Sequence, residues 1–174
     1  MLDALILQKV KRAERLAHPY RDLDVVDSRA PRFNQAVVGL VSLLAVLTGW
    51  WWLLALLAIQ LAVGLTLGRR FCLPCLTYFE LVQPVFGEGR LEDARPPRFA
   101  NTVGATVLTA ASFAYGLGFP TAGVALGALV AALALLASAT GFCAGCEAYK
   151  LGYLLTGRRF VSCPLPPRPS IDRG

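Results

Sequence analysis

Residues 31–65 read PRFNQAVVGLVSLLAVLTGWWWLLALLAIQLAVGL, and this stretch decides the fold. After Arg32 it contains no Asp, Glu, Lys, Arg or His, and the short Thr48-Gly49 break divides it into two apolar runs. A helix needs about 20 apolar residues to cross the hydrocarbon core of a bilayer. We therefore expect two membrane-spanning helices, residues 33–48 and 50–67, that form a hairpin.

A second pair of uncharged apolar runs follows at residues 99–117 and 121–140, with residues 118–120 between them. The chain of 174 residues is 56% hydrophobic and only 16% charged, whereas soluble domains average about 25% charged residues. The predicted fold class is an all-α membrane protein. It is a four-transmembrane-helix bundle made of two helical hairpins, with short helices on the cytoplasmic face.

The basic residues predict the orientation. Of the 17 Lys and Arg residues, seven precede the first span, five lie between the hairpins, five follow the last span and none lies at a hairpin tip. Basic residues stay on the cytoplasmic side, so we expect a multi-pass protein of the cell inner membrane with both termini cytoplasmic. Because these charges flank membrane segments and form no basic groove, the sequence argues against nucleic-acid binding.

The two halves of the chain share a motif. Pro31-Arg32-Phe33 opens the first half, which ends in Cys72-Leu73-Pro74-Cys75 and Tyr78. Pro97-Arg98-Phe99 opens the second half, which ends in Cys143-Ala144-Gly145-Cys146 and Tyr149. We expect two parallel repeats, residues 31–82 and 97–155, related by an axis along the membrane normal. They form a membrane domain, 27–155, between an amphipathic interfacial segment, 1–26, and a Pro-rich tail, 156–174.

The paired cysteines favour redox or sulfur chemistry. A thiol at a helix N-terminus is acidified, Pro74 suits a first helical turn, and Arg69 and Arg70 precede Cys72 closely enough to favour its thiolate. In this hypothesis Cys72 and Cys143 attack while Cys75 and Cys146 resolve. The chain then relays disulfides or persulfide sulfur with a soluble partner. Structural disulfides are not expected in the cytoplasm.

Other roles for the cysteines stay open. Cys72, Cys75, Cys143 and Cys146 match the four thiolates of a zinc site or an iron–sulfur cluster. The chain would then be a non-enzymatic membrane subunit held by a structural metal. The pairs also suit apolar packing, and Cys163 is either an idle thiol or a shuttle. A quinone-linked dithiol oxidase ranks low, because such enzymes work on the non-cytoplasmic face. The enzyme class and the oligomeric state stay undecided.

Three stretches carry a resemblance to a known family: DSRAPRFNQ at 27–35, EDARPPRFA at 92–100 and GFCAGCEA at 141–148. They resemble the bacterial membrane family called domain of unknown function 4395, over about residues 26–155. Members of that family are often encoded beside thioredoxin-like proteins and rhodanese-type sulfurtransferases. The resemblance implies thiol or sulfur chemistry with such a partner and assigns no catalytic role to any residue.

Overall fold

The structure is a computed structural model that describes residues 17–155 and 157. The interfacial helix expected at 2–16 and the Pro-rich tail with Cys163 lie outside the described residues. The described chain is mostly helical. Its elements in order are β1 (Val25–Asp27), α2 (Arg29–Thr48), α3 (Trp52–Thr66), η1 (Arg69–Phe71), α4 (Leu73–Thr77), η2 (Tyr78–Val82), α5 (Gln83–Phe86), β2 (Leu91–Asp93), α6 (Arg95–Gly116), α7 (Pro120–Thr140) and α8 (Ala144–Leu155).

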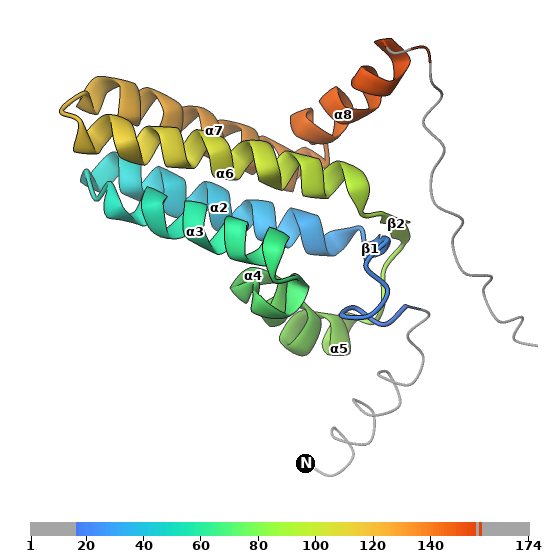
Figure 1. Cartoon of the computed structure of the whole chain (residues 1–174). Coiled ribbons are helices and arrows are strands. Elements are labelled where there is room, and N and C mark those ends of the chain that lie inside the picture. Colours follow the sequence, from blue (N-terminus) through green and yellow to red (C-terminus); the bar gives the residue numbers. More distant parts are fainter. Residues whose placement is uncertain (1–16, 156, 158–174) are drawn as a thin grey trace, which may run out of the picture.

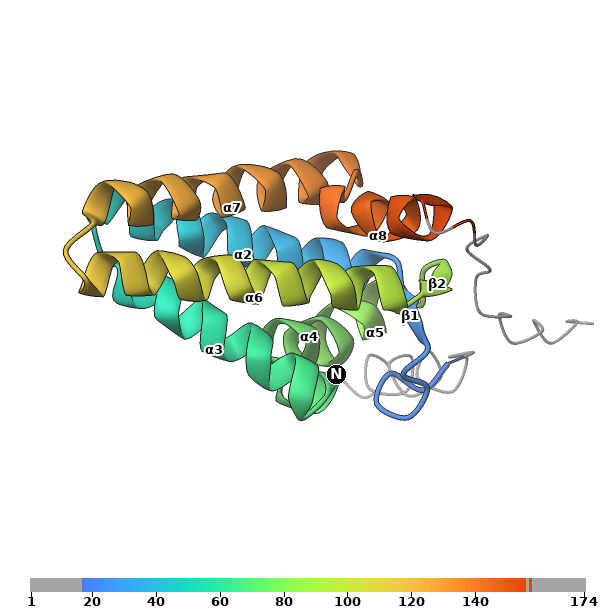
Figure 2. The same ribbon diagram turned by 45° about the horizontal axis from the view of Figure 1, so that its top comes forward.

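Four long helices form a bundle of two hairpins, α2–α3 and α6–α7 (Figures 1 and 2). Each helix of the first hairpin packs mainly on a helix of the second: α2 packs on α7, and α3 packs on α6. Leu54 and Leu108 fill the centre. Gly49 and Gly118 let the chain reverse at the tips, since their φ angles of 74° and 84° suit glycine. The predicted hairpins and their tips are therefore present.

Two of the described helices, α2 and α7, are long and apolar enough to cross a membrane. The sequence predicted four such spans. The apolar helix α3 has 15 residues, which is shorter than a span requires. Helix α6 has 22 residues, but it begins with two arginines and carries four Ser and Thr hydroxyls that lower its hydropathy. By length and composition, the structure thus provides two membrane-capable helices.

The two short strands were not predicted, because an all-α fold was expected. Strands β1 and β2 form an antiparallel ribbon in which Val26 faces Glu92, Val25 faces Asp93 and Asp27 faces Leu91. The strands precede α2 and α6, so the ribbon joins the starts of the two hairpins. Three-residue strands of mixed polarity give no periodic signal in a sequence.

The segments that follow the hairpins lie at the end of the bundle opposite the tips (Figures 1 and 2). After α3 the chain makes the 3₁₀ turn η1 and then a helical run of α4, the π-helical segment η2 and α5. After α7 the chain forms α8. The two halves of the chain make equivalent aromatic contacts. The ring centroids of Phe33 and Tyr78 lie 5.9 Å apart, and those of Phe99 and Tyr149 lie 5.4 Å apart.

Candidate thiol site

Cys72 and Cys75 are joined in a disulfide, with their Cα atoms 5.2 Å apart. Cys72 is the N-cap residue of α4 and Pro74 lies in its first turn, as predicted. That first turn brings the two sulfurs together. Cys72 is only 4% exposed, and its Cβ lies against Gly64, where an added methyl group would meet it at 3.0 Å. The structure thus contains a disulfide in this pair, which is also the oxidised state of the predicted Cys72–Cys75 redox pair.

The sequence predicted that Arg69 favours the thiolate of Cys72, but Cys72 is in a disulfide and the Arg69 side chain binds elsewhere. Its guanidinium donates to the backbone carbonyls of Pro19, Asp22 and Leu23 at 2.8–3.2 Å. Burial is the main cause that lowers the pKa of Arg69 to about 10, and nearby Arg98 adds to the effect. Arg69 therefore fastens the chain before β1 to the end of the α2–α3 hairpin.

The segment after Cys75 is anchored on a buried carboxylate. Asp27 is 2% exposed, and its Oδ2 accepts hydrogen bonds from the Tyr78 hydroxyl at 2.9 Å, the Gln83 amide at 3.2 Å and the Gly89 N–H at 2.9 Å. Its Oδ1 accepts from the Arg29 N–H at 3.0 Å. A buried carboxylate with this many donors is well compensated. Asp27 thus fixes the helical run that carries the disulfide.

Cys143 and Cys146 are free thiols, both partly exposed. Cys143 directly precedes α8, and its sulfur accepts hydrogen bonds from the Cys146 N–H and from the Gln35 side-chain amide of α2, each at 3.3 Å. These contacts and a thiol hydrogen bond from Cys146, the largest cause, lower the pKa of Cys143 to about 6. The pKa of Cys146 is raised, chiefly by its hydrogen bond to Cys143 and then by burial. Cys143 is therefore the acidic thiol of the pair.

Cys143 lies between two different cavities. One has about 220 Å³ and is mostly apolar; it is lined by α2, α3, α6 and α7 and by residues 143–145. The other is an open polar pocket of about 650 Å³ that contains both Cys143 and Cys146, with Arg32, Arg90 and Lys150 on its walls. The Arg32 guanidinium lies against Gly141, where a Cβ would collide with it. The thiol therefore faces an apolar space on one side and an open polar space on the other.

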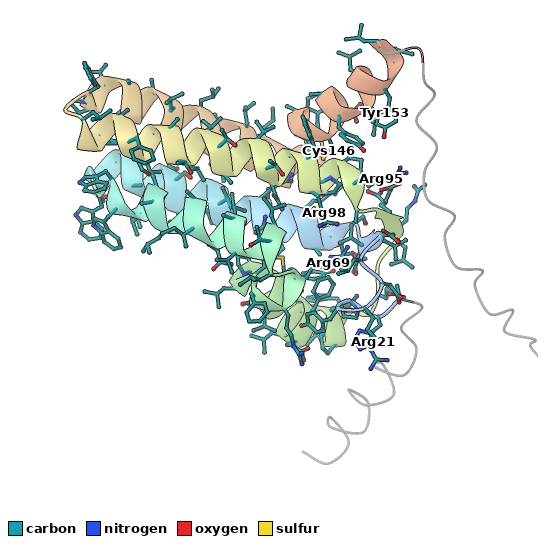
Figure 3. The ribbon with its side chains drawn as sticks, in the orientation of Figure 1. Arg21, Arg69, Arg95, Arg98, Cys146 and Tyr153 are labelled. Carbon is teal, nitrogen blue, oxygen red and sulfur yellow. A yellow bond between two sulfur atoms is a disulfide. The ribbon has the colours of Figure 1, made fainter. Side chains whose placement is uncertain are left out.

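The two cysteine pairs do not form a common metal site. Within residues 17–155 and 157, no three His, Cys, Asp or Glu side chains converge in a way that could hold a metal. Figure 3 shows Cys146, a residue of α8, next to α6, whereas α4, which contains Cys75, lies on the other side of the bundle in Figure 1. The four-cysteine zinc or iron–sulfur alternative is therefore not supported, because the repeat places the pairs on opposite flanks of the bundle.

Sequence reasoning named the four cysteines but missed Gln35, which contacts Cys143. Gln35 and Asn101 occupy the same position after Pro-Arg-Phe in the two motifs, and that match is a signal that was available. Asn34, which is 3% exposed, donates to Asn101 at 3.3 Å. These three polar side chains at the starts of α2 and α6 line the apolar cavity next to Cys143.

Comparison with known proteins gives one match. No curated protein and no solved structure matches the chain. A family model matches residues 26–153, which span β1, the bundle, both cysteine pairs and most of α8. The chain therefore belongs to the family described as domain of unknown function DUF4395.

Proposed function

We propose that this chain is an integral membrane protein whose Cys143–Cys146 dithiol exchanges disulfides or persulfide sulfur with a soluble partner of the thioredoxin or rhodanese type. The observation that carries the proposal is the hydrogen bonding of Cys143, which lowers the pKa of a partly exposed thiol to about 6. A thiolate is the nucleophile in thiol chemistry. At neutral pH, Cys143 is then mostly ionised while Cys146 keeps its proton.

The membrane part of the proposal is a four-span bundle with both termini in the cytoplasm. Large apolar side chains point outward along all four helices, far more than a soluble surface carries in one belt. They include Leu40, Leu47, Leu56, Ile59, Phe113, Leu129 and Leu133. In α3, the flanking Trp50 and Trp51 and Leu67 extend the apolar stretch beyond the helix ends.

The hydroxyls of α6 are compatible with a bilayer. Each donates to the carbonyl oxygen four residues earlier, at 2.8–3.0 Å. In hydrocarbon an unpaired hydroxyl is costly, and this local bond removes the cost. The residues concerned are Thr102, Thr106, Thr109 and Ser112. Helix α6 therefore suits the bilayer in spite of its lower hydropathy.

In disulfide exchange, the Cys143 thiolate attacks one sulfur of a partner disulfide and releases the partner's other sulfur as a thiolate. Cys146 gives up its proton and attacks Cys143 in the mixed disulfide. The partner leaves as a dithiol and the chain holds a Cys143–Cys146 disulfide. The reverse steps oxidise a partner dithiol. With a persulfide, the Cys143 thiolate attacks the outer sulfur, the partner's S–S bond breaks and the partner's thiolate leaves.

The test is thiol trapping in native membranes. In a Cys146→Ser variant, Cys143 cannot be resolved, so a mixed disulfide with a thioredoxin-like partner should accumulate. Cys143→Ser is the matched control and should trap nothing. If alkylation shows that Cys143 is unreactive at neutral pH and no mixed disulfide or persulfide is recovered, the proposal is wrong.

A further inference from the structure

The apolar cavity beside Cys143 has features that thiol exchange with a soluble partner does not use. It has a volume of about 220 Å³ and lies between α6 and α7 at the level of Leu133 and Ala137. For scale, an engineered cavity of about 150 Å³ in another protein binds benzene. The space beside Cys143 therefore accommodates a substituted six-membered ring.

One end of this cavity is polar and incomplete. Asn34 lies there, and its Oδ1 is buried without a hydrogen-bond partner among the described residues. A buried unpaired acceptor costs free energy, so it suits a ligand that brings a hydroxyl donor. Gln35 and Asn101 line the same end and carry amide N–H groups that suit a carbonyl acceptor.

Another part of the cavity lining is formed by side chains that are exposed on the bundle surface. Leu129 and Leu133 of α7 and Val103 of α6 line it, and each is well exposed. In the proposed membrane orientation this surface meets lipid tails. An apolar tail attached to the ring would leave the cavity here.

From these features we propose that the cavity binds a quinone, with its ring beside Cys143 and its tail between α6 and α7, and that the quinone oxidises the Cys143–Cys146 dithiol. The proposal rests on the exchange function proposed above and names its oxidant. The sequence ranked a quinone-linked oxidase low because such enzymes work on the non-cytoplasmic face; the cavity beside Cys143 is the structural reason to propose a quinone on the cytoplasmic side of this bundle. A quinone carbonyl accepts hydrogen bonds from the amides of Gln35 and Asn101, and the quinol hydroxyl donates to Asn34. An acyl chain of a lipid has no group for these three side chains.

The reaction balances with the quinone as the electron acceptor. The Cys143 thiolate and the Cys146 thiol lose two electrons and one proton and form the S–S bond. The quinone takes up these two electrons and two protons, one from Cys146 and one from water in the open polar pocket. A soluble dithiol then reduces the Cys143–Cys146 disulfide from that pocket. The net reaction moves two electrons from the partner to the membrane quinone.

The experiment uses the full chain in quinone-free lipid nanodiscs, reduced and kept anaerobic. The probe is decylubiquinone, a benzoquinone with an alkyl tail. Its loss of ultraviolet absorbance and the alkylation of Cys143 and Cys146 are followed together. We expect the quinone to become quinol as the two thiols become protected, and Cys143→Ser to stop both changes.

Cavity variants separate bound quinone from chance oxidation. An added Cβ at Gly104 meets only Leu61, at 3.7 Å, so Gly104→Ala fits and serves as the control. Gly104→Phe fills the cavity and should slow quinone reduction by about 100-fold, since a displacement of about 1 Å from reacting geometry has an effect of that size. Leu133→Trp on the exposed wall should slow it too and serves as a second variant if Gly104→Phe does not fold. A midpoint of Cys143 alkylation near pH 6 in the absence of quinone reports that the site is folded, because its contacts with Cys146 and Gln35 lower the pKa of the thiol.

Three outcomes overturn the quinone site. The first is a dithiol that still exchanges with a soluble disulfide but is not oxidised by decylubiquinone, which would leave the exchange function standing. The second is quinone reduction at the same rate in Gly104→Phe, Leu133→Trp and Gly104→Ala. The third is native mass spectrometry that finds only phospholipid bound, with no displacement by the quinone. Loss of exchange in the presence of normal quinone reduction would instead refute the exchange function alone.

Discussion

The two CxxC motifs share a sequence pattern and a position after a hairpin, yet their surroundings differ. Cys72 and Cys75 form a disulfide in which Cys72 is buried and Cys75 partly exposed, and the helical run that follows contributes Tyr78, Phe79 and Gln83 to the interior. Cys143 and Cys146 are partly exposed thiols, and no residue of α8 is buried. The same motif is therefore bonded and followed by a buried helical run in the first half, and left as two free thiols before an exposed helix in the second.

The carboxylates at the starts of the two hairpins also differ in the contacts they make. Asp27 accepts from three groups of the segment after Cys75, whereas its counterpart Asp93 forms an ion pair at 2.6 Å with Arg95, two residues along the chain. The first carboxylate therefore ties the cysteine segment to the bundle. The Asp93 carboxylate also acts on Tyr149 of α8, and α8 packs against α6 without buried side chains.

The largest expected effect comes from replacing the first cysteine of each pair by serine. Cys143→Ser should abolish mixed-disulfide formation with a thioredoxin-like probe, because it removes the acidic thiol. Cys72→Ser should leave that reaction in place and lower the free energy of unfolding by about 2 kcal/mol, which is the loop-closure estimate for so short a loop. Trapping gels and denaturation in detergent measure the two effects. A loss of trapping in Cys72→Ser with normal folding would contradict the division of roles.

The next effect concerns the carboxylates at the hairpin starts. Asp27→Ala leaves the Tyr78 hydroxyl, the Gln83 amide and the Gly89 N–H without their acceptor in a buried place. We expect a loss of about 3–5 kcal/mol in the free energy of unfolding, as for removal of one partner of a buried charge network. Asp93→Ala is the matched variant. It should cost less, about 1–2 kcal/mol, because the side chain of Arg95 is 39% exposed and can be hydrated.

Thermal denaturation of the two variants in the same detergent gives the comparison. Reduction of the Cys72–Cys75 disulfide by an added phosphine gives a local readout, since Asp27→Ala should make it faster and Asp93→Ala should not. Equal losses of stability in the two variants would mean that Asp27 is not what anchors the first cysteine segment.

A smaller effect is expected on the pH dependence of Cys143. Its alkylation rate should follow the thiolate fraction, with a midpoint near pH 6, a plateau above it and a tenfold fall per pH unit well below it. Gln35→Leu removes a hydrogen bond to the thiolate, so the pKa should rise by about 0.5–1 unit, the equivalent of about 1 kcal/mol. Gln60→Leu is the control, because Gln60 donates to the Phe71 carbonyl. A midpoint that does not move in Gln35→Leu would remove Gln35 from the site.

The sequence was sufficient for features that depend on local patterns. The apolar runs predicted the hairpins, Gly49 and Gly118 marked their tips, and Pro74 marked the helix start at the first cysteine pair. Contacts across long separations could not be predicted in this way. Gln35 meets Cys143 across 108 residues and Asp27 meets Gly89 across 62, and no periodicity encodes such pairs. Two features of the site depend on long-range contacts of this kind. Only one of the two cysteine pairs forms a disulfide, and the two pairs share no metal site.

The smallest effect is expected at the ion pair on α8. Lys150 and Glu147 lie 2.8 Å apart, but their side chains are 46% and 49% exposed. Such pairs contribute about 0–1 kcal/mol, so Lys150→Ala should change the free energy of unfolding by less than about 0.5 kcal/mol. Its effect on the alkylation midpoint of Cys143 should be smaller than that of Gln35→Leu, because Lys150 does not touch the sulfur. A larger shift would mean that charge in the open polar pocket, more than hydrogen bonding by Gln35, controls the reactive thiol.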